Sequence, residues 1–116
     1  MKRVYLAGKY SADNIIDCLS NINEGITCGA MLLSKGYAVF CPFLDHHFAL
    51  TPYSPLLEKK HYQNNSMAWV DVSDALLIMP HSEGSKGVQR EIERAKDLGI
   101  PVFYSLHDLD EWRDSK

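Results

Sequence analysis

The chain has 116 residues, of which 46% are hydrophobic and 23% are charged, as expected for one globular domain of ordinary size. Its 12 basic and 15 acidic residues give a formal net charge of −3, which argues against a protein that binds nucleic acid through a basic face. The longest apolar run, residues 75–79, is too short to span a membrane, and the opening residues do not resemble a signal peptide. The three cysteines lack C-x-x-C spacing, so we expect free thiols, a cytoplasmic protein and no zinc site.

In the first half of the chain, two short apolar runs flank a long amphipathic segment. Residues 4–7 are predicted to form a buried strand that ends at Gly8. The next segment is predicted to be a helix that ends at Gly36, a typical C-cap residue, and residues 37–41 a second strand. Apolar residues that recur every three or four positions predict the buried face of this helix: Ile15, Leu19, Ile22, Ile26, Ala30 and Leu33.

The second half continues the alternation of helix and strand. Residues 42–55 are rich in proline, histidine and aromatic side chains, which indicates an ordered loop or lid rather than a linker. A helix is expected from about residue 55 to 72, with a break near Asn64 and Asn65. Residues 75–79 and 101–104 are predicted strands, and the helix between them, residues 88–98, ends at Gly99. Residues 108–113 are expected to form one or two final helical turns; Leu109 and Trp112 are spaced so that they could hold these turns to the domain, but a solvated helix end is favoured.

Alternation of helices with fully apolar strands indicates a parallel sheet that is covered on both faces. We therefore predict a single three-layer α/β domain over residues 1–116, Rossmann-like or flavodoxin-like, with four to five parallel strands. In such sheets ligands bind at the carboxyl ends of the strands. The site is therefore expected to be built from the loop after Ala7 and from residues 42–55 and 80–87.

One carboxylate lies on an otherwise apolar face of the helix over residues 88–98. Successive residues turn by about 100° around a helix, and this places Glu91 inside the apolar arc, between Ala95 and Leu98. One interpretation is that Glu91 lies at the rim of the sheet and pairs with Arg94 or Lys9. The other is that it points into a pocket and acts as a nucleophile or general base.

The loop before this helix combines two glycines, a hydroxyl and a lysine, in residues 84–87. Backbone N–H groups at a helix N-terminus, together with the hydroxyl of Ser85, suit a phosphate group. The loop has neither the Walker P-loop pattern nor the dinucleotide pattern G-x-G-x-x-G. The alternative is an ordinary helix start with Ser85 as its N-cap.

Three segments together resemble the nucleoside 2-deoxyribosyltransferase-like superfamily, and they extend over nearly the whole chain. They are residues 4–8, residues 69–77 with Trp69 five positions before Asp74, and residues 85–102 with Glu91 and the glycine-proline end. The resemblance implies that Glu91 attacks the anomeric carbon of a 2-deoxyribosyl group and forms a covalent intermediate. It also implies that Ser85, with Gly87 and Val88, binds a 5′-phosphate, and that Gly8 and Tyr10 line the sugar and base.

This sequence departs from the superfamily at two positions. Lys9 stands where proline often follows the first glycine, and Ser66 stands where an aspartate usually assists the leaving base. A serine cannot protonate a leaving base as a carboxylic acid does, and His61 is a possible substitute. Ser66 is accordingly expected to line the pocket rather than to act as the acid.

The resulting prediction is an N-glycosidase or deoxyribosyltransferase, that is, a hydrolase or transferase, acting on a (deoxy)nucleoside 5′-monophosphate. It would use Glu91 as nucleophile, without a metal or a cofactor, and would form a homodimer or higher homo-oligomer that binds neither nucleic acid nor membrane. Because of Ser66, the alternative is a nucleotide-binding or sequestering protein with weak turnover. A further alternative is an assembly or regulatory module. His46 and His47 are adjacent in the predicted lid, so a structural role is favoured over metal binding.

Overall fold

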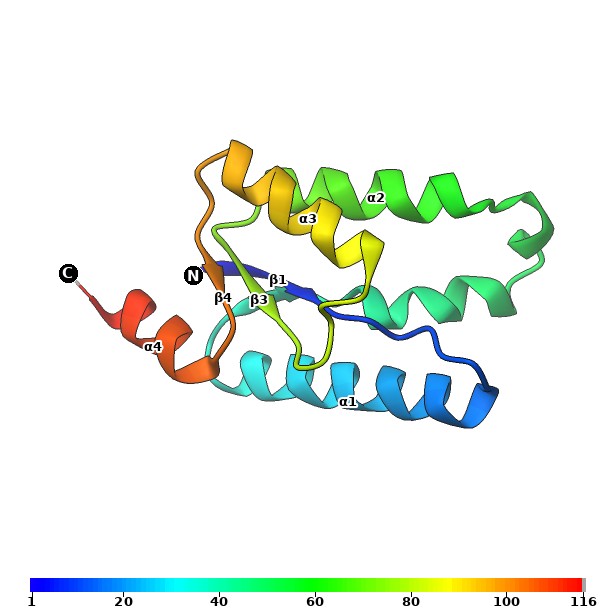
Figure 1. Ribbon diagram of the computed structural model, residues 1–116, viewed down its shortest axis with the longest axis horizontal. Coiled ribbons are helices and arrows are strands. Elements are labelled where there is room, and N and C mark those ends of the chain that lie inside the picture. The colour runs from blue at the N-terminus through cyan, green and yellow to red at the C-terminus, as the bar shows by residue number, and fades with distance from the viewer. Residues whose placement is uncertain (116) are drawn as a thin grey trace.

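The computed structural model describes residues 1–115 and contains a four-stranded, all-parallel sheet in the order β2-β1-β3-β4 (Figure 1). The strands are β1 (Arg3–Ala7), β2 (Ala38–Phe40), β3 (Ala75–Ile78) and β4 (Val102–Phe103). In the register, Tyr5 is paired with Phe40 on one side and with Leu76 on the other. The direction in which successive strands are added reverses between β1 and β3, which is where open α/β sheets bind their ligands.

The central strands are apolar on both faces, and their side chains alternate between two cores. Val4 and Leu6 of β1 face one core, whereas Tyr5 and Ala7 face the other. Ala75 and Leu77 of β3 join the first core, and Leu76 and Ile78 join the second. Burial on both faces is typical of a parallel sheet between two helical layers.

Two helices cover each face of the sheet. α1 (Ile15–Ser34) and α4 (Leu106–Asp114) pack on the first core, and α2 (Lys59–Asp71) and α3 (Lys86–Asp97) pack on the second (Figure 1). Gly36 and Gly99 adopt positive φ after α1 and α3, as the predicted C-caps require. The predicted three-layer α/β architecture with a parallel sheet, compatible with a Rossmann-like fold, is therefore confirmed. Leu109 of α4 is fully buried, so this helix packs on the domain instead of forming the solvated end that the sequence favoured.

The predicted buried face of α1 is wrong in part. Ile15, Leu19 and Leu33 are 67%, 53% and 61% exposed. The face that packs on the sheet is instead formed by Ile22, Gly25, Gly29 and Leu32. Gly25 is buried because the ring of Phe43 occupies the space that a side chain there would need: a Cβ on Gly25 would lie 2.3 Å from the ring. A periodicity pattern counts large apolar residues and therefore misses glycines. For this reason the predicted buried face differs from the face that packs on the sheet.

The expected single helix over residues 55–72 is also corrected. The segment after β2 forms two 3-10 helices, η1 (Pro42–Leu50) and η2 (Ser54–Leu56), and α2 begins only at Lys59. A reciprocal pair of hydrogen bonds between Glu58 and His61 fixes this start, and the helix continues through Asn64 and Asn65 without a break. Among the helices of residues 1–115, none combines the length and apolar character that a membrane crossing requires.

Candidate functional site

A buried tyrosine holds the carboxylate that the sequence places on the apolar face of α3. Tyr5 is fully buried, and its side chain faces the layer formed by α2 and α3. Its hydroxyl donates a hydrogen bond to Oε2 of Glu91, which is half-buried in the second turn of α3. Arg94, the alternative partner, forms two hydrogen bonds with Asp71 of α2, at 2.7 and 3.1 Å. Glu91 therefore points inward rather than pairing at the rim.

The surroundings of Glu91 make it titrate near neutrality. Burial raises the pKa of its carboxyl group to about 7, against the opposing effects of the Tyr5 hydrogen bond and Arg90. Burial, reinforced by the charge of Glu91, raises the pKa of the Tyr5 phenol well above its ordinary value. Tyr5 thus remains a proton donor in the hydrogen bond, and Glu91 can exist in either protonation state at physiological pH.

Ser66 belongs to the same group of side chains. It lies in α2 and is buried. A hydrogen bond from Ser66 lowers the pKa of Tyr5, in opposition to burial. Ser66 and Glu91 are therefore both neighbours of Tyr5, and their shared part in a substrate site stays a prediction. His61 instead uses Nδ1 to accept a hydrogen bond from the Glu58 N–H at the start of α2, which is a structural role and not that of a substitute acid.

Two more ionisable groups act on this site from the carboxyl edge of the sheet. Tyr10, in the loop after β1, is 41% exposed, and its ring meets that of Phe43 edge-on at a centroid distance of 6.1 Å. Burial raises its pKa, followed by the charges of Asp45 and, more weakly, Glu91. Asp45, in η1, is half-buried, and burial raises the pKa of its carboxyl group as well.

Sequence reasoning missed Tyr5 and Asp45. A tyrosine in the middle of a short apolar strand resembles an ordinary core residue, and Tyr5 is indeed buried. Asp45 lies in a segment predicted to belong to the ligand-binding edge, but the histidines and aromatic side chains dominate the pattern of that segment. An acidic residue shortly after the end of a parallel strand was the signal that could have identified it.

The turn after β1 passes through a narrow space, which explains Gly8. A Cβ at this position would lie 2.7 Å from Cζ of Phe43 and 2.8 Å from the side chain of Met79. The next residue, Lys9, donates its backbone N–H to Oγ of the buried Ser82 at 3.2 Å. A residue with a side chain would not fit at position 8, so the close packing of this edge, which also carries Tyr10, requires a glycine there.

The start of α3 has the geometry of a capped helix with free backbone donors. Oγ of Ser85 accepts a hydrogen bond from the Val88 N–H at 3.2 Å, so Ser85 is the N-cap. The Val88 side chain is buried in the second core. The N–H groups of Lys86 and Gly87 occupy the first two helical positions, which have no partner within a helix. These two groups and the Ser85 hydroxyl remain suited to an anion, whereas the Val88 N–H is already bonded.

Two surface cavities flank the site. The larger, about 320 Å³, lies between the loop after β1, α1 and the loop after β3, with Lys9, Phe43 and His81 in its wall. The second, about 280 Å³, lies between β3 and α3 and is lined in part by Val88 and Tyr104. Glu91 is not among the residues that line either cavity.

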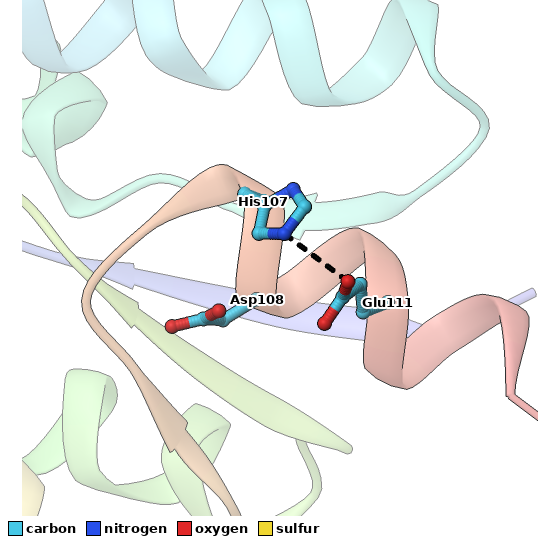
Figure 2. Close-up of side chains that lie close together, drawn as sticks. All are labelled: His107, Asp108 and Glu111. Atoms are coloured by element: carbon cyan, nitrogen blue, oxygen red, sulfur yellow. Dashed lines mark ion pairs between the residues drawn. The ribbon is translucent and has the colours of Figure 1, made fainter.

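A cluster with metal-ligating side chains lies on α4, on the other face of the sheet (Figure 2). His107, Asp108 and Glu111 each offer one ligand atom, and these atoms lie within 4.8 Å of one another. Figure 2 shows His107 and Glu111 facing each other, with Nε2 and Oε1 3.1 Å apart, while Asp108 points to another side. All three side chains are exposed to water. Replacing this water by a metal ion would therefore contribute little binding free energy. The cluster has no connection to Glu91.

Comparison with known proteins identifies a family but no activity. No curated protein matches the chain. A family model described as "Domain of unknown function (DUF7768)" matches residues 2–105. The match includes Tyr5, Asp45, Ser66, Ser85 and Glu91, whereas the α4 cluster lies outside it. The chain therefore belongs to the DUF7768 family, and the matched region contains every residue of the site built around Glu91.

Proposed function

We propose that this protein cleaves the base–sugar bond of a 2′-deoxynucleoside 5′-monophosphate, as an N-glycosidase or a deoxyribosyltransferase, with Glu91 as nucleophile. The observation that carries the proposal is the half-buried Glu91 carboxylate, which accepts a hydrogen bond from the buried Tyr5 hydroxyl. A carboxylate with a raised pKa beside a fixed donor, near the edge where parallel sheets bind ligands, is typical of a reactive group. The resemblance to the 2-deoxyribosyltransferase-like superfamily supports the same role.

In the proposed reaction, one oxygen of ionised Glu91 attacks C1′ of the sugar as the C1′–N bond to the base breaks. The hydroxyl of Tyr5 holds the other oxygen and orients the carboxylate. The glycosyl–enzyme ester is then resolved by water in a hydrolase or by a second base in a transferase. Release of free base from the four common 2′-deoxynucleoside 5′-monophosphates, followed by chromatography, tests the reaction. Mass spectrometry of the quenched protein tests for the ester on Glu91.

The start of α3 supports the preference for a phosphate-bearing substrate. The positive end of the helix dipole, the N–H groups of Lys86 and Gly87 and the Ser85 hydroxyl can all face an anion. A hydrogen bond to a charged group contributes roughly 1.5–3 kcal/mol. We therefore expect Ser85→Ala to weaken the binding of a monophosphate about tenfold or more, with little effect on the corresponding nucleoside.

Calorimetric titration with dAMP and with deoxyadenosine measures this difference. Ser105→Ala is the matched control, because Ser105 caps α4 in the same way and accepts from the Asp108 N–H at 3.1 Å. Both variants lose an N-cap, which costs about 1 kcal/mol of stability, but only Ser85→Ala should lose the preference for the phosphate. Equal affinity of wild type for nucleotide and nucleoside would contradict the phosphate site.

A second candidate is a nucleotide-binding protein with little turnover. It is favoured by Ser66, which occupies the buried position beside Tyr5 where a carboxylic acid would assist the leaving base. Tight binding of a monophosphate without base release or a trapped ester would support this candidate over the enzyme.

We also propose that the partner of this chain is a second copy of itself. Ile15, Ile16 and Leu19 expose apolar side chains on the part of α1 that extends beyond the strand ends (Figure 1). Phe48 and Leu50, in the segment that leads toward α2, are also exposed. α1 and η1 are neighbouring elements. Exposed apolar side chains on adjacent segments are typical of interaction sites, and a symmetric contact would cover both segments at once.

Leu19→Lys is expected to convert a dimer into a monomer in sedimentation velocity experiments. The charged group would have to be buried against the partner, at a cost of several kcal/mol. Leu98→Lys is the control, because Leu98 is also exposed, at 45%, but lies at the far end of α3. A wild-type protein that remains monomeric at high micromolar concentration would contradict the assembly.

A further inference from the structure

The larger of the two cavities, of about 320 Å³, lies on the α1 side of the sheet, where β1 and β3 end. Its walls are the loop after β1, the first half of α1 and the loop after β3, which reaches toward α1 in Figure 1. The order in which strands are added reverses between β1 and β3, so the cavity lies where open α/β sheets bind ligands. Its volume is that of about ten water molecules, which suits a ligand of about ten non-hydrogen atoms.

The segments around this cavity hold one another in place. The backbone N–H of Lys9 donates to Oγ of the buried Ser82 at 3.2 Å and so joins the loop after β1 to the loop after β3. The side-chain amide of Asn21, on α1, donates to the carbonyl oxygen of Tyr10 at 3.4 Å. Phe43, which also lines the cavity, is buried. The cavity is therefore already formed without a ligand, as binding sites for small molecules usually are.

Charged side chains of both signs line this one cavity. Asp17 and Glu24 come from α1, whereas Lys9 and His81 come from the two loops. All four are exposed, and within residues 1–115 none of them forms an ion pair. The carboxylate of Asp17 accepts a hydrogen bond from Nδ2 of Asn14 at 2.9 Å, which fixes its position at the start of the helix. The cavity thus offers acidic acceptors on one wall and basic donors on the others.

The backbone of His81 is a second unusual feature of the cavity. Its φ is 63°, and no other residue with a side chain has a positive φ in the described part of the chain. Such conformations are unfavourable and are concentrated at active sites and ligand clamps. The turn after Pro80 therefore holds the imidazole at the cavity wall at a cost in backbone strain.

We infer that this cavity binds a small zwitterion of the amino-acid type, with its ammonium group against Asp17 and Glu24 and its carboxylate against Lys9 and His81. Glu91 is not part of the lining, so the inference does not rest on the proposed function. Side chains that can form neutral hydrogen bonds with the rest of the ligand are Ser11, Ser20 and Asn21.

A ligand with charges of both signs fits this lining better than a ligand with one. A simple anion would be repelled by the two carboxylates of α1, and a simple cation by Lys9. A nucleoside monophosphate carries a charge of about −2 at its phosphate and no positive charge, so it is disfavoured for the same reason. A zwitterion instead satisfies both walls at once, and this assigns the cavity a ligand different from that proposed for the start of α3.

An NMR titration of the isotope-labelled full chain tests the inference. The probes are the common L-α-amino acids and the ω-amino acids from glycine to 8-aminooctanoate, whose two charges lie progressively farther apart. Each is compared with analogues that lack one charged group, such as hexylamine and hexanoate for 6-aminohexanoate. At least one zwitterion should saturably shift the amide signals of residues 9–12, 17–24 and 79–81. It should bind about tenfold or more tightly than either of its analogues.

Single substitutions then remove the charged groups in turn. Glu24→Gln and Lys9→Gln should each weaken binding of that zwitterion about tenfold, because each removes one hydrogen bond to a charged group. His81→Asn should also weaken it, and asparagine tolerates the positive φ of the turn. Glu93→Gln and Lys96→Gln are the matched controls, since both residues are exposed on α3, and they should leave the affinity unchanged.

The analogues distinguish a ligand contact from a structural role. Glu24→Gln should weaken the zwitterion but not its anionic analogue, because the anion has no ammonium group to lose a partner. Lys9→Gln should weaken the zwitterion but not its cationic analogue. A residue that only maintains the shape of the cavity would change the affinity for all three compounds together.

Several results would overturn the inference. They are the absence of saturable shifts with every zwitterion, equal affinity for a zwitterion and one of its analogues, and unchanged affinity in both Glu24→Gln and Lys9→Gln. Displacement of the zwitterion by dAMP would also overturn it, because the nucleotide would then occupy this cavity. None of these measurements depends on base release, so the proposed function is tested independently.

Discussion

Glu91→Gln is expected to abolish base release, by about 10³-fold or more, while leaving the fold intact. The amide has nearly the shape of the carboxylate and still accepts a hydrogen bond from the Tyr5 hydroxyl, but it cannot attack C1′. Nucleotide binding should change little, because the predicted phosphate contacts come from residues 85–87. Base release and calorimetric binding, measured on the same preparation, separate loss of chemistry from loss of binding.

The same variant should be more stable than wild type above neutral pH. The pKa of Glu91 rises from an ordinary value of 4.5 to about 7 on folding, so the folded state disfavours the ionised form. Stability is therefore lost as pH rises from about 4.5 through about 7, and the loss is complete above that value. Each unit of pKa shift corresponds to about 1.4 kcal/mol, so the gain in Glu91→Gln reaches up to about 3 kcal/mol at pH 8 and vanishes near pH 4.

Urea unfolding at pH 4.5, 6 and 8 measures this dependence. Glu93→Gln is the control, since Glu93 is exposed on the opposite side of α3 and should show no such trend. A stability difference that does not vary with pH would contradict the buried ionisation of Glu91. Full base release by Glu91→Gln would rule out the covalent mechanism.

Gly25→Ala is expected to destabilise the protein by about 3 kcal/mol. A Cβ at this position would lie 2.3 Å from Cγ and Cδ2 of Phe43, so the buried ring must leave its place between α1 and Gly8. Overpacking typically costs 1–3 kcal/mol, and loss of a buried phenylalanine from its site costs 3–5 kcal/mol. The higher helix propensity of alanine offsets no more than about 1 kcal/mol of this loss.

The matched control is Gly87→Ala, because Gly87 also lies in a helix but has only Ser85 Oγ nearby, at 3.8 Å from the point that a Cβ would occupy. This variant should be neutral or slightly stabilised in urea unfolding. The double variant Gly25→Ala with Phe43→Leu should recover part of the loss, because the two positions share one space. If Gly25→Ala were as stable as Gly87→Ala, the packing of Phe43 on α1 would be contradicted.

The errors in the predicted helices have a common physical origin. Periodicity counts large apolar residues, and it favours Ile15, Leu19 and Leu33 for the buried face of α1. The helix instead turns Gly25 and Gly29 toward the sheet, because the side chains of Phe43 and Cys41 fill the space next to them. Of the residues left outside, Ile15 and Leu19 belong to the apolar surface that we propose to be covered by a second copy. Similarly, hydrogen bonds between Glu58 and His61 set the start of α2, whereas the proline at residue 55 led to the prediction of an earlier helix start.

By itself, the sequence determined the order of strands and helices, the parallel sheet, the glycine caps and the place of Glu91 on the apolar face of its helix. These features depend on local patterns: apolar runs, helical spacing and residues with special backbone freedom. Only the tertiary structure decided which side chains surround the carboxylate of Glu91. Tyr5 lies 86 positions away in the chain, and Ser66, which adjoins Tyr5, comes from a further element. Their meeting depends on the register of β1 against its neighbours and on how α2 and α3 pack on one face of the sheet. Packing between distant elements leaves no period or spacing in the sequence. For this reason the residues indicated the carboxylate but not Tyr5, and Ser66 was suggested only by the family resemblance.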